Sequence, residues 1–163
     1  MDIYQHIKAK AHNASVQNKK FFNRLKRSTP KNLDEVTHQL HQEVFEYTDC
    51  LKCANCCKTT SPIFYERVIE RASKQLHIRP AEFTEKFLRV DEDKDYVLKS
   101  SPCTFLQEDN TCSIYEHRPN ACREYPHTNR KKFYQILELT YKNTFVCPAV
   151  FDIVEKLKKA FNH

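Results

Sequence analysis

Glycine is absent from all 163 residues of the chain. A Walker loop, a dinucleotide-binding fingerprint and a glycine-rich kinase loop all need glycine where the backbone approaches phosphate closely. The sequence therefore excludes these three kinds of nucleotide site. The spacing C-x3-C-x2-C, which belongs to radical-initiating iron–sulfur enzymes, is absent as well.

Long apolar runs are also missing. No stretch of eighteen apolar residues occurs, so the sequence predicts no membrane span. The first residues, MDIYQH, contain no apolar segment, and we therefore expect no signal peptide and a cytoplasmic location. In a reducing cytoplasm, clustered thiols bind metal more often than they form disulfides.

Acidic residues are scarce at the beginning of the chain, although the net charge is only +6 overall. Residues 1–31 contain eight Lys and Arg against Asp2 alone, which gives +7, so the other 132 residues sum to −1. A basic leader of this kind can contact an acidic partner. A solvated helix face is the plainer reading, and no recognition motif supports nucleic acid as the partner.

Apolar spacing predicts a mainly α protein with a small β-hairpin, arranged as an irregular, cysteine-rich, metal-centred single domain. We expect a basic helical extension over residues 1–31 and the metal-chelating domain over 32–163. The predicted helices cover 2–26, 33–47, 61–76 (capped by Ser61 before Pro62), 80–88 and 149–161, with one helical turn at 119–125. Residues 133–141 are helical or extended. We expect a strand at 96–98 and a hairpin of 104–106 with 111–115, with Asp109-Asn110 in its turn tolerating a left-handed conformation.

Cysteine is the residue that the chain has in abundance. Four thiols, Cys50, Cys53, Cys56 and Cys57, fall within eight residues, and Cys103, Cys112, Cys122 and Cys147 follow. The run C-x2-C-x2-C supplies three corners of a four-iron cluster in bacterial ferredoxins, and there a cysteine before proline completes the motif. Here Cys147 precedes Pro148. The spacing therefore predicts metal bound by thiolates, as an iron–sulfur cluster of the 4Fe-4S type or as zinc.

The division of these thiols is open. Side chains of adjacent residues such as Cys56 and Cys57 usually diverge, which favours two sites or one polynuclear cluster. One division places Cys50, Cys53, Cys56 and Cys147 at one site and Cys57, Cys103, Cys112 and Cys122 at another, and eight thiols allow many others. His77, His117 or His127 can replace a thiolate, and Arg118 and Arg123 can offset the negative charge of a tetrathiolate site.

These motifs resemble the YkgJ-type cysteine-cluster family of zinc- or iron-chelating CxxCxxCC domains. Its hallmark is met by Cys50 to Cys57, and its second block, P-C-x-F-L followed by C-x-I-Y-x-x-R-P-x-x-C-x-x-Y/F-P, is met by residues 102–106 and 112–126. Cys147-Pro148 resembles the closing cysteine, so the resemblance covers about residues 47–150. It implies eight metal-chelating cysteines in a small cytosolic protein, sometimes described as an iron–sulfur oxidoreductase.

The functional hypotheses follow from metal binding. The first is a metal- or cluster-binding protein acting in electron transfer or metal handling. The alternative is a zinc-stapled interaction module that docks an acidic protein partner through its basic N-terminal helix. A methylase-like enzyme ranks last, because a glycine-free chain offers little with which to build a nucleotide-like methyl-donor site.

Overall fold

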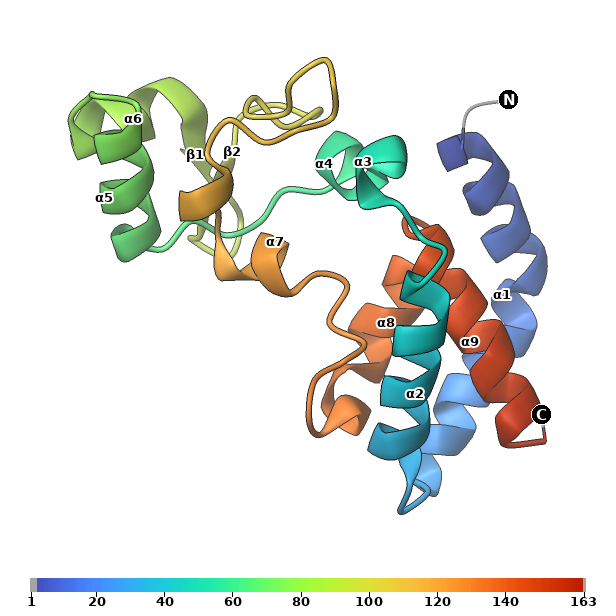
Figure 1. The fold of residues 1–163 in the computed structure, drawn as a ribbon. Coiled ribbons are helices and arrows are strands. Elements are labelled where there is room, and N and C mark those ends of the chain that lie inside the picture. Colours follow the sequence, from blue (N-terminus) through green and yellow to red (C-terminus); the bar gives the residue numbers. More distant parts are fainter. Residues whose placement is uncertain (1–2, 163) are drawn as a thin grey trace. The chain divides into compact units, whose positions relative to one another are not determined.

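The computed structural model describes residues 3–162. The chain forms two compact units (Figure 1). Residues 1–50 and 126–163 make up the helical unit, and residues 51–125 make up the cysteine unit. Each is described by itself.

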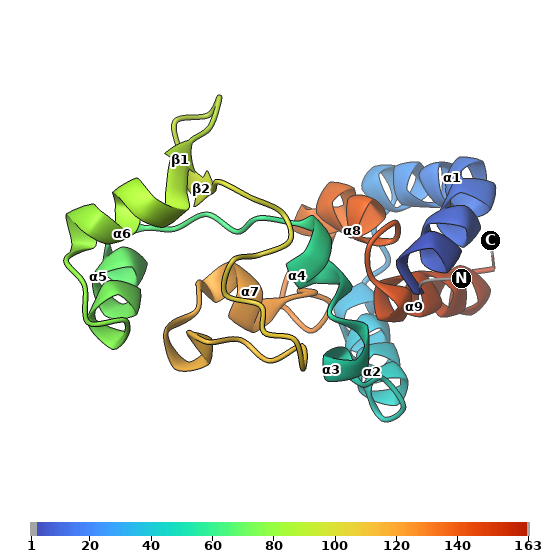
Figure 2. The same ribbon diagram turned by 90° about the horizontal axis from the view of Figure 1, so that it is seen from above.

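The helical unit is built from α-helices that lie side by side in both views of the ribbon (Figures 1 and 2). Its elements are α1 (Ile3–Arg27), α2 (Leu33–Phe45), the 3-10 helix η2 (Phe133–Ile136), α8 (Leu137–Asn143) and α9 (Pro148–Ala160). Phe21, Leu25, Leu33, Phe133 and Leu157 are almost fully buried between them. Two of these side chains, Phe21 and Leu25, come from α1, so α1 contributes to the core of the helical unit, and the division at residues 31 and 32 stays a prediction.

Polar contacts join parts of the helical unit that are far apart in sequence. The Asp34 carboxylate accepts hydrogen bonds from the backbone N–H groups of Lys132 and Phe133, at 2.7 and 2.9 Å. Arg24 donates to the carbonyl oxygen of Phe161 at 2.8 Å. These contacts fix the first turn of α2 to the start of η2, and the end of α1 to the end of α9.

The cysteine unit has short elements around an aromatic cluster. They are α3 (Cys50–Cys53, whose first residue belongs to the helical unit), α4 (Asn55–Thr59), α5 (Glu66–Gln75), α6 (Pro80–Phe87), β1 (Leu88–Val90), β2 (Tyr96–Leu98), η1 (Tyr115–His117) and α7 (Asn120–Glu124). The rings of Phe64, Phe83, Phe87 and Phe105 contact one another with centroids 5.1–6.2 Å apart. Cys103 and Cys112 pack against this cluster.

The mainly helical class with one small hairpin is confirmed, but the hairpin lies elsewhere. Strand β2 pairs antiparallel with β1, in the register Leu88↔Leu98, and β1 begins directly where α6 ends. The predicted hairpin of 104–106 with 111–115 is wrong, since it is reduced to one bridge between Leu106 and Cys112. Its turn is as expected, with Asn110 in the left-handed region at φ 65°.

Two further predictions need correction. The helix expected from Ser61 begins only at Glu66, because the Ser61 hydroxyl accepts a hydrogen bond from Leu98 N–H at 2.9 Å instead of capping a helix. The cysteine segment up to Thr60, for which no helix was predicted, contains the short helices α3 and α4. Within residues 3–162, no helix combines the length and the apolar character needed to span a bilayer.

Candidate metal centre

The first cysteine motif is folded by a left-handed residue between two short helices. Ala54 has φ 50° and ψ 16° and stands at the start of α4, where it reverses the chain after α3. A residue other than glycine in this conformation costs about 1–2 kcal/mol. The loop offsets that cost with local bonds: Lys58 N–H donates to the Ala54 carbonyl at 3.1 Å, and Thr59 Oγ1 donates to the Asn55 carbonyl at 2.7 Å.

Four thiols from different parts of the cysteine unit are gathered near one another. The backbone N–H of Cys103 donates to the carbonyl of Cys57 at 2.8 Å, which fixes the loop after β2 against α4. The bridge between Leu106 and Cys112 holds the next cysteine beside that loop. The Cys57 thiol interacts electrostatically with the thiols of Cys103, Cys112 and Cys122. We call Cys57, Cys103, Cys112 and Cys122 the four-thiol group.

Burial and mutual repulsion resist ionisation of three of these thiols. Burial raises the pKa of Cys103 and Cys112, and the neighbouring thiols raise it further. The pKa of Cys122 is raised to about 12, first by desolvation of its thiol and then by the other three sulfurs. Cys122 is exposed as a whole residue, and the desolvation concerns its thiol. A bound cation is what would favour the thiolate forms.

Cys57 differs from the other three thiols. A hydrogen bond with the Cys56 side chain, aided by the nearby Lys58 charge, lowers the pKa of Cys57 to about 7 against the effect of burial. The Lys58 ammonium also donates to the Cys53 carbonyl at 3.3 Å. From the sequence alone, Lys58 had no predicted effect on the thiols, although its place directly after the paired cysteines was a visible signal.

The chemistry of the donor set fits zinc or iron, both of which are bound by four thiolates. The four sulfurs are neighbours rather than a preformed coordination shell, because no three His, Cys, Asp or Glu side chains of the described residues converge closely enough to hold an ion. Their role as metal ligands therefore stays a prediction, although they are the same four residues that the sequence analysis placed together.

The other four predicted ligands are divided between the two units. Cys50 and Cys53 are the first and last residues of α3, and Cys56 lies in α4. Cys147 stands just before α9, in the helical unit. Cys50 and Cys147 thus belong to one unit and Cys53 and Cys56 to the other, so the first predicted set stays a prediction.

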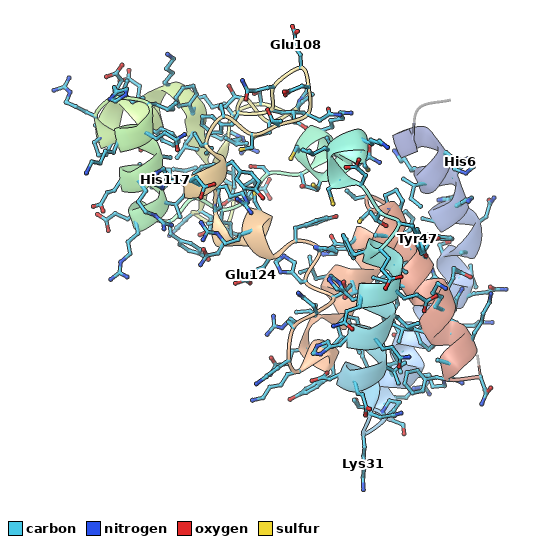
Figure 3. All side chains as sticks on the ribbon, in the orientation of Figure 1. His6, Lys31, Tyr47, Glu108, His117 and Glu124 are labelled. Carbon is cyan, nitrogen blue, oxygen red and sulfur yellow. The ribbon has the colours of Figure 1, made fainter. Side chains whose placement is uncertain are left out.

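The three histidines proposed as substitutes occupy turns. His77 follows the end of α5 in the left-handed region at φ 57°. His117 ends η1, and His127 also has a positive φ, of 66°. Figure 3 labels His117 and, apart from it, Glu124, the last residue of α7.

The two arginines of the second motif differ in what they contact. The Arg118 guanidinium carbon lies 3.6 Å from the centroid of the Tyr115 ring, and its charge lowers the pKa of Cys112 and Cys122. Arg123 donates to the Glu116 carbonyl at 3.0 Å. The stacking of Arg118 on Tyr115 was not foreseen, although their i, i+3 spacing across a turn allowed it.

Comparison with known proteins gives one result. A family model described as "CxxCxxCC: putative zinc- or iron-chelating domain" matches residues 49–144, more than half of the chain. The match includes seven of the eight cysteines, with Cys147 beyond its end. No curated protein and no solved structure matches the chain significantly.

Proposed function

Because the chain belongs to the CxxCxxCC family of zinc- or iron-chelating domains, we propose that it binds metal through its cysteine thiolates and acts in electron transfer or metal handling. The observation that carries this proposal is the four-thiol group. Four residues spread over 66 positions of the chain, from 57 to 122, have their thiols within electrostatic reach of one another. Such proximity is unfavourable for thiolates alone and favourable for thiolates around a cation.

The surroundings of the group suit a site of this kind. Cys103 and Cys112 pack against the aromatic cluster, which excludes water on that side. The Arg118 charge acts on Cys112 and Cys122, and Lys58 lies beside Cys57. When bound, zinc would supply a structural cross-link, whereas an iron–sulfur cluster would supply a one-electron carrier.

The experiment is metal analysis of protein purified without oxygen. Visible absorbance with iron and inorganic sulfide in the protein would support electron transfer, and stoichiometric zinc in a colourless protein would refute it. Cys112→Ser should lower the metal content, because it removes one donor of the four-thiol group, whereas Ser113→Ala beside it should leave the content unchanged. Equal metal content in the Cys112→Ser variant and the wild type would refute the assignment of this group.

A second candidate is the zinc-stapled module that docks an acidic protein, and the distribution of charge favours it. The helical unit contains fifteen Lys and Arg against nine Asp and Glu, whereas the cysteine unit contains twelve of each. The whole excess of +6 therefore lies in the helical unit. Lys19 and Lys20 are both exposed on α1, where a partner can reach them.

Charge reversal tests this candidate better than truncation does. Deleting α1 would remove Phe21 and Leu25 from the core and unfold the unit. In Lys19→Glu/Lys20→Glu the fold should survive, and binding to an acidic probe such as poly-glutamate should weaken at least tenfold at low salt. Lys74→Glu/Lys86→Glu, which changes two exposed lysines of the balanced unit, is the matched control. Equal loss in both variants would refute docking through α1.

A further inference from the structure

Strand β1 of the cysteine unit has an outer edge, on the side away from β2. In an antiparallel pair, backbone groups that face the partner strand alternate with groups that face away from it. Asp91 N–H donates to the Asp95 carbonyl at 2.9 Å, so position 91 faces β2. Leu88 and Val90 are out of phase with position 91, and their carbonyl groups and the Val90 N–H therefore point outward.

The outer edge of β2 is covered by the segment that leads into α5. The Tyr96 carbonyl accepts a hydrogen bond from Phe64 N–H at 2.8 Å, and Leu98 N–H donates to the Ser61 hydroxyl at 2.9 Å. These are the groups of β2 that the alternation turns outward, so the phase assigned to β1 agrees with the contacts of its partner strand.

The outer edge of β1 is open by contrast. The Leu88 N–H ends α6 by donating to the Thr84 carbonyl. Among the described residues, none forms a hydrogen bond with the Leu88 carbonyl or with the N–H and carbonyl of Val90. Val90 is also 55% exposed, so its side chain leaves this edge accessible. An exposed edge of this kind can accept an extended segment as a further strand.

The side chains beside the open edge are apolar on one face and acidic at its end. Val90 lies opposite Tyr96 in the register, so their side chains share a face, and Tyr96 is 40% exposed. The turn after β1, residues 91–95, contains four acidic residues and one lysine, a net charge of −3. Glu92 and Asp93 of this turn are exposed, and Figure 2 shows the turn projecting beyond α5 and α6.

These features indicate the chemistry of the partner. An extended segment along β1 places alternate side chains on the face of Val90 and Tyr96, and its end runs past the acidic turn. Apolar residues at alternate positions, with lysine or arginine between them, complement both features. A second copy of the chain fits less well. The three-residue strand spans only about 10 Å, so the two acidic turns would lie within about one Debye length of each other and repel.

We propose that the open edge of β1 binds a basic, extended peptide segment of another protein by strand addition, with apolar side chains of that segment against Val90 and Tyr96. The backbone of β1 supplies the hydrogen bonds, and the acidic turn supplies the preference for a basic sequence. This interaction surface goes beyond metal binding, and it requires only that the cysteine unit is folded.

The test measures binding of a fluorescein-labelled hexapeptide, in which lysine alternates with valine, to the full chain by fluorescence polarisation. The matched control peptide has the same sequence with N-methyl groups on its four central backbone amides. These groups remove the donors that a strand needs and leave every charge in place. The control peptide should bind at least tenfold more weakly than its parent.

Variants of the chain test the edge and the charge separately. Val90→Pro removes an outward N–H without breaking a bond to β2 and should weaken binding at least tenfold, whereas Val90→Thr should stay within threefold of the wild type. Glu92→Lys/Asp93→Lys should weaken binding at least tenfold at low salt. Glu66→Lys/Glu70→Lys, which makes the same change of charge at exposed positions of α5, should stay within threefold.

The inference is overturned if the wild type does not bind the peptide, if the N-methylated peptide binds as tightly as its parent, or if both charge-reversed variants lose binding equally. Thermal melts establish that Val90→Pro is folded, and the peptide pair decides the matter if it is not. Sedimentation tests the second copy: a wild-type dimer that Val90→Pro abolishes would show that β1 pairs with β1, and would overturn the partner proposed here.

Discussion

Binding of zinc to the four-thiol group should release about 3.5 protons at pH 7. Burial keeps the thiols of Cys103, Cys112 and Cys122 protonated in the metal-free protein, so each loses a full proton when it becomes a ligand. Cys57, with a pKa of about 7, is half ionised and contributes about half a proton. The logarithm of the affinity should therefore rise by about 3.5 per pH unit near pH 7 and by nearly 4 near pH 6.

Isothermal titration calorimetry in buffers of different ionisation enthalpy measures this number directly. The variant Cys50→Ser/Cys53→Ser/Cys147→Ser isolates the four-thiol group while leaving Cys56 in place. Adding Cys56→Ala removes the hydrogen bond that lowers the pKa of Cys57, so the release should increase towards four protons, whereas Cys56→Ser should retain the lower value. A release of two protons or fewer would refute coordination by four thiols. An unchanged release with Cys56→Ala would refute the account of Cys57.

Three further predictions concern stability. His77→Gly should raise the free energy of unfolding of the cysteine unit by about 1 kcal/mol in urea titrations. Position 77 is left-handed at φ 57°, and glycine adopts this conformation without a Cβ clash. A loss of stability in this variant would contradict the prediction. Asp34→Ala should lower the free energy of unfolding by about 1–2 kcal/mol, since two backbone N–H groups lose their acceptor. Asp34→Asn should lower it less. Equal losses in the two variants would show that these hydrogen bonds are not the source of the stability. Burial, aided by the neighbouring His38, lowers the pKa of His41. The stability that neutral His41 contributes is therefore complete above about pH 6.5 and is lost as the pH falls towards its lower folded-state pKa. Thermal melts of His41→Gln should show a flatter pH dependence of stability over this range, and a dependence identical to that of the wild type would exclude His41 as its cause.

The sequence predicted local features well, because helices and tight turns depend on neighbours a few residues apart. The apolar period located α2, α6 and α9 to within about two residues, and Asn110 takes the left-handed conformation expected of it. The cysteine spacing identified the family to which the chain belongs.

Strand pairing was predicted less well, since a strand is defined by its partner. The segment 104–106 has as much strand character as residues 88–90, and only the pairing of β1 with β2 decides which of them forms the hairpin. The same pairing redirected Ser61 from a helix cap to a bond with the backbone of β2. Neither the strand pairing nor the role of Ser61 could be predicted from residues within one helical turn of the position concerned.

The amino-acid sequence by itself determined the chemistry available to this protein: eight thiols, no glycine for phosphate loops, and an excess of positive charge. The tertiary structure decided which groups meet. It joined Cys57 to the loop of Cys103 through a backbone hydrogen bond, and it stacked the Arg118 guanidinium on the Tyr115 ring. The physical reason is that electrostatic and hydrogen-bonding energies depend on distance in space, and the path of the folded chain sets that distance between residues remote in sequence.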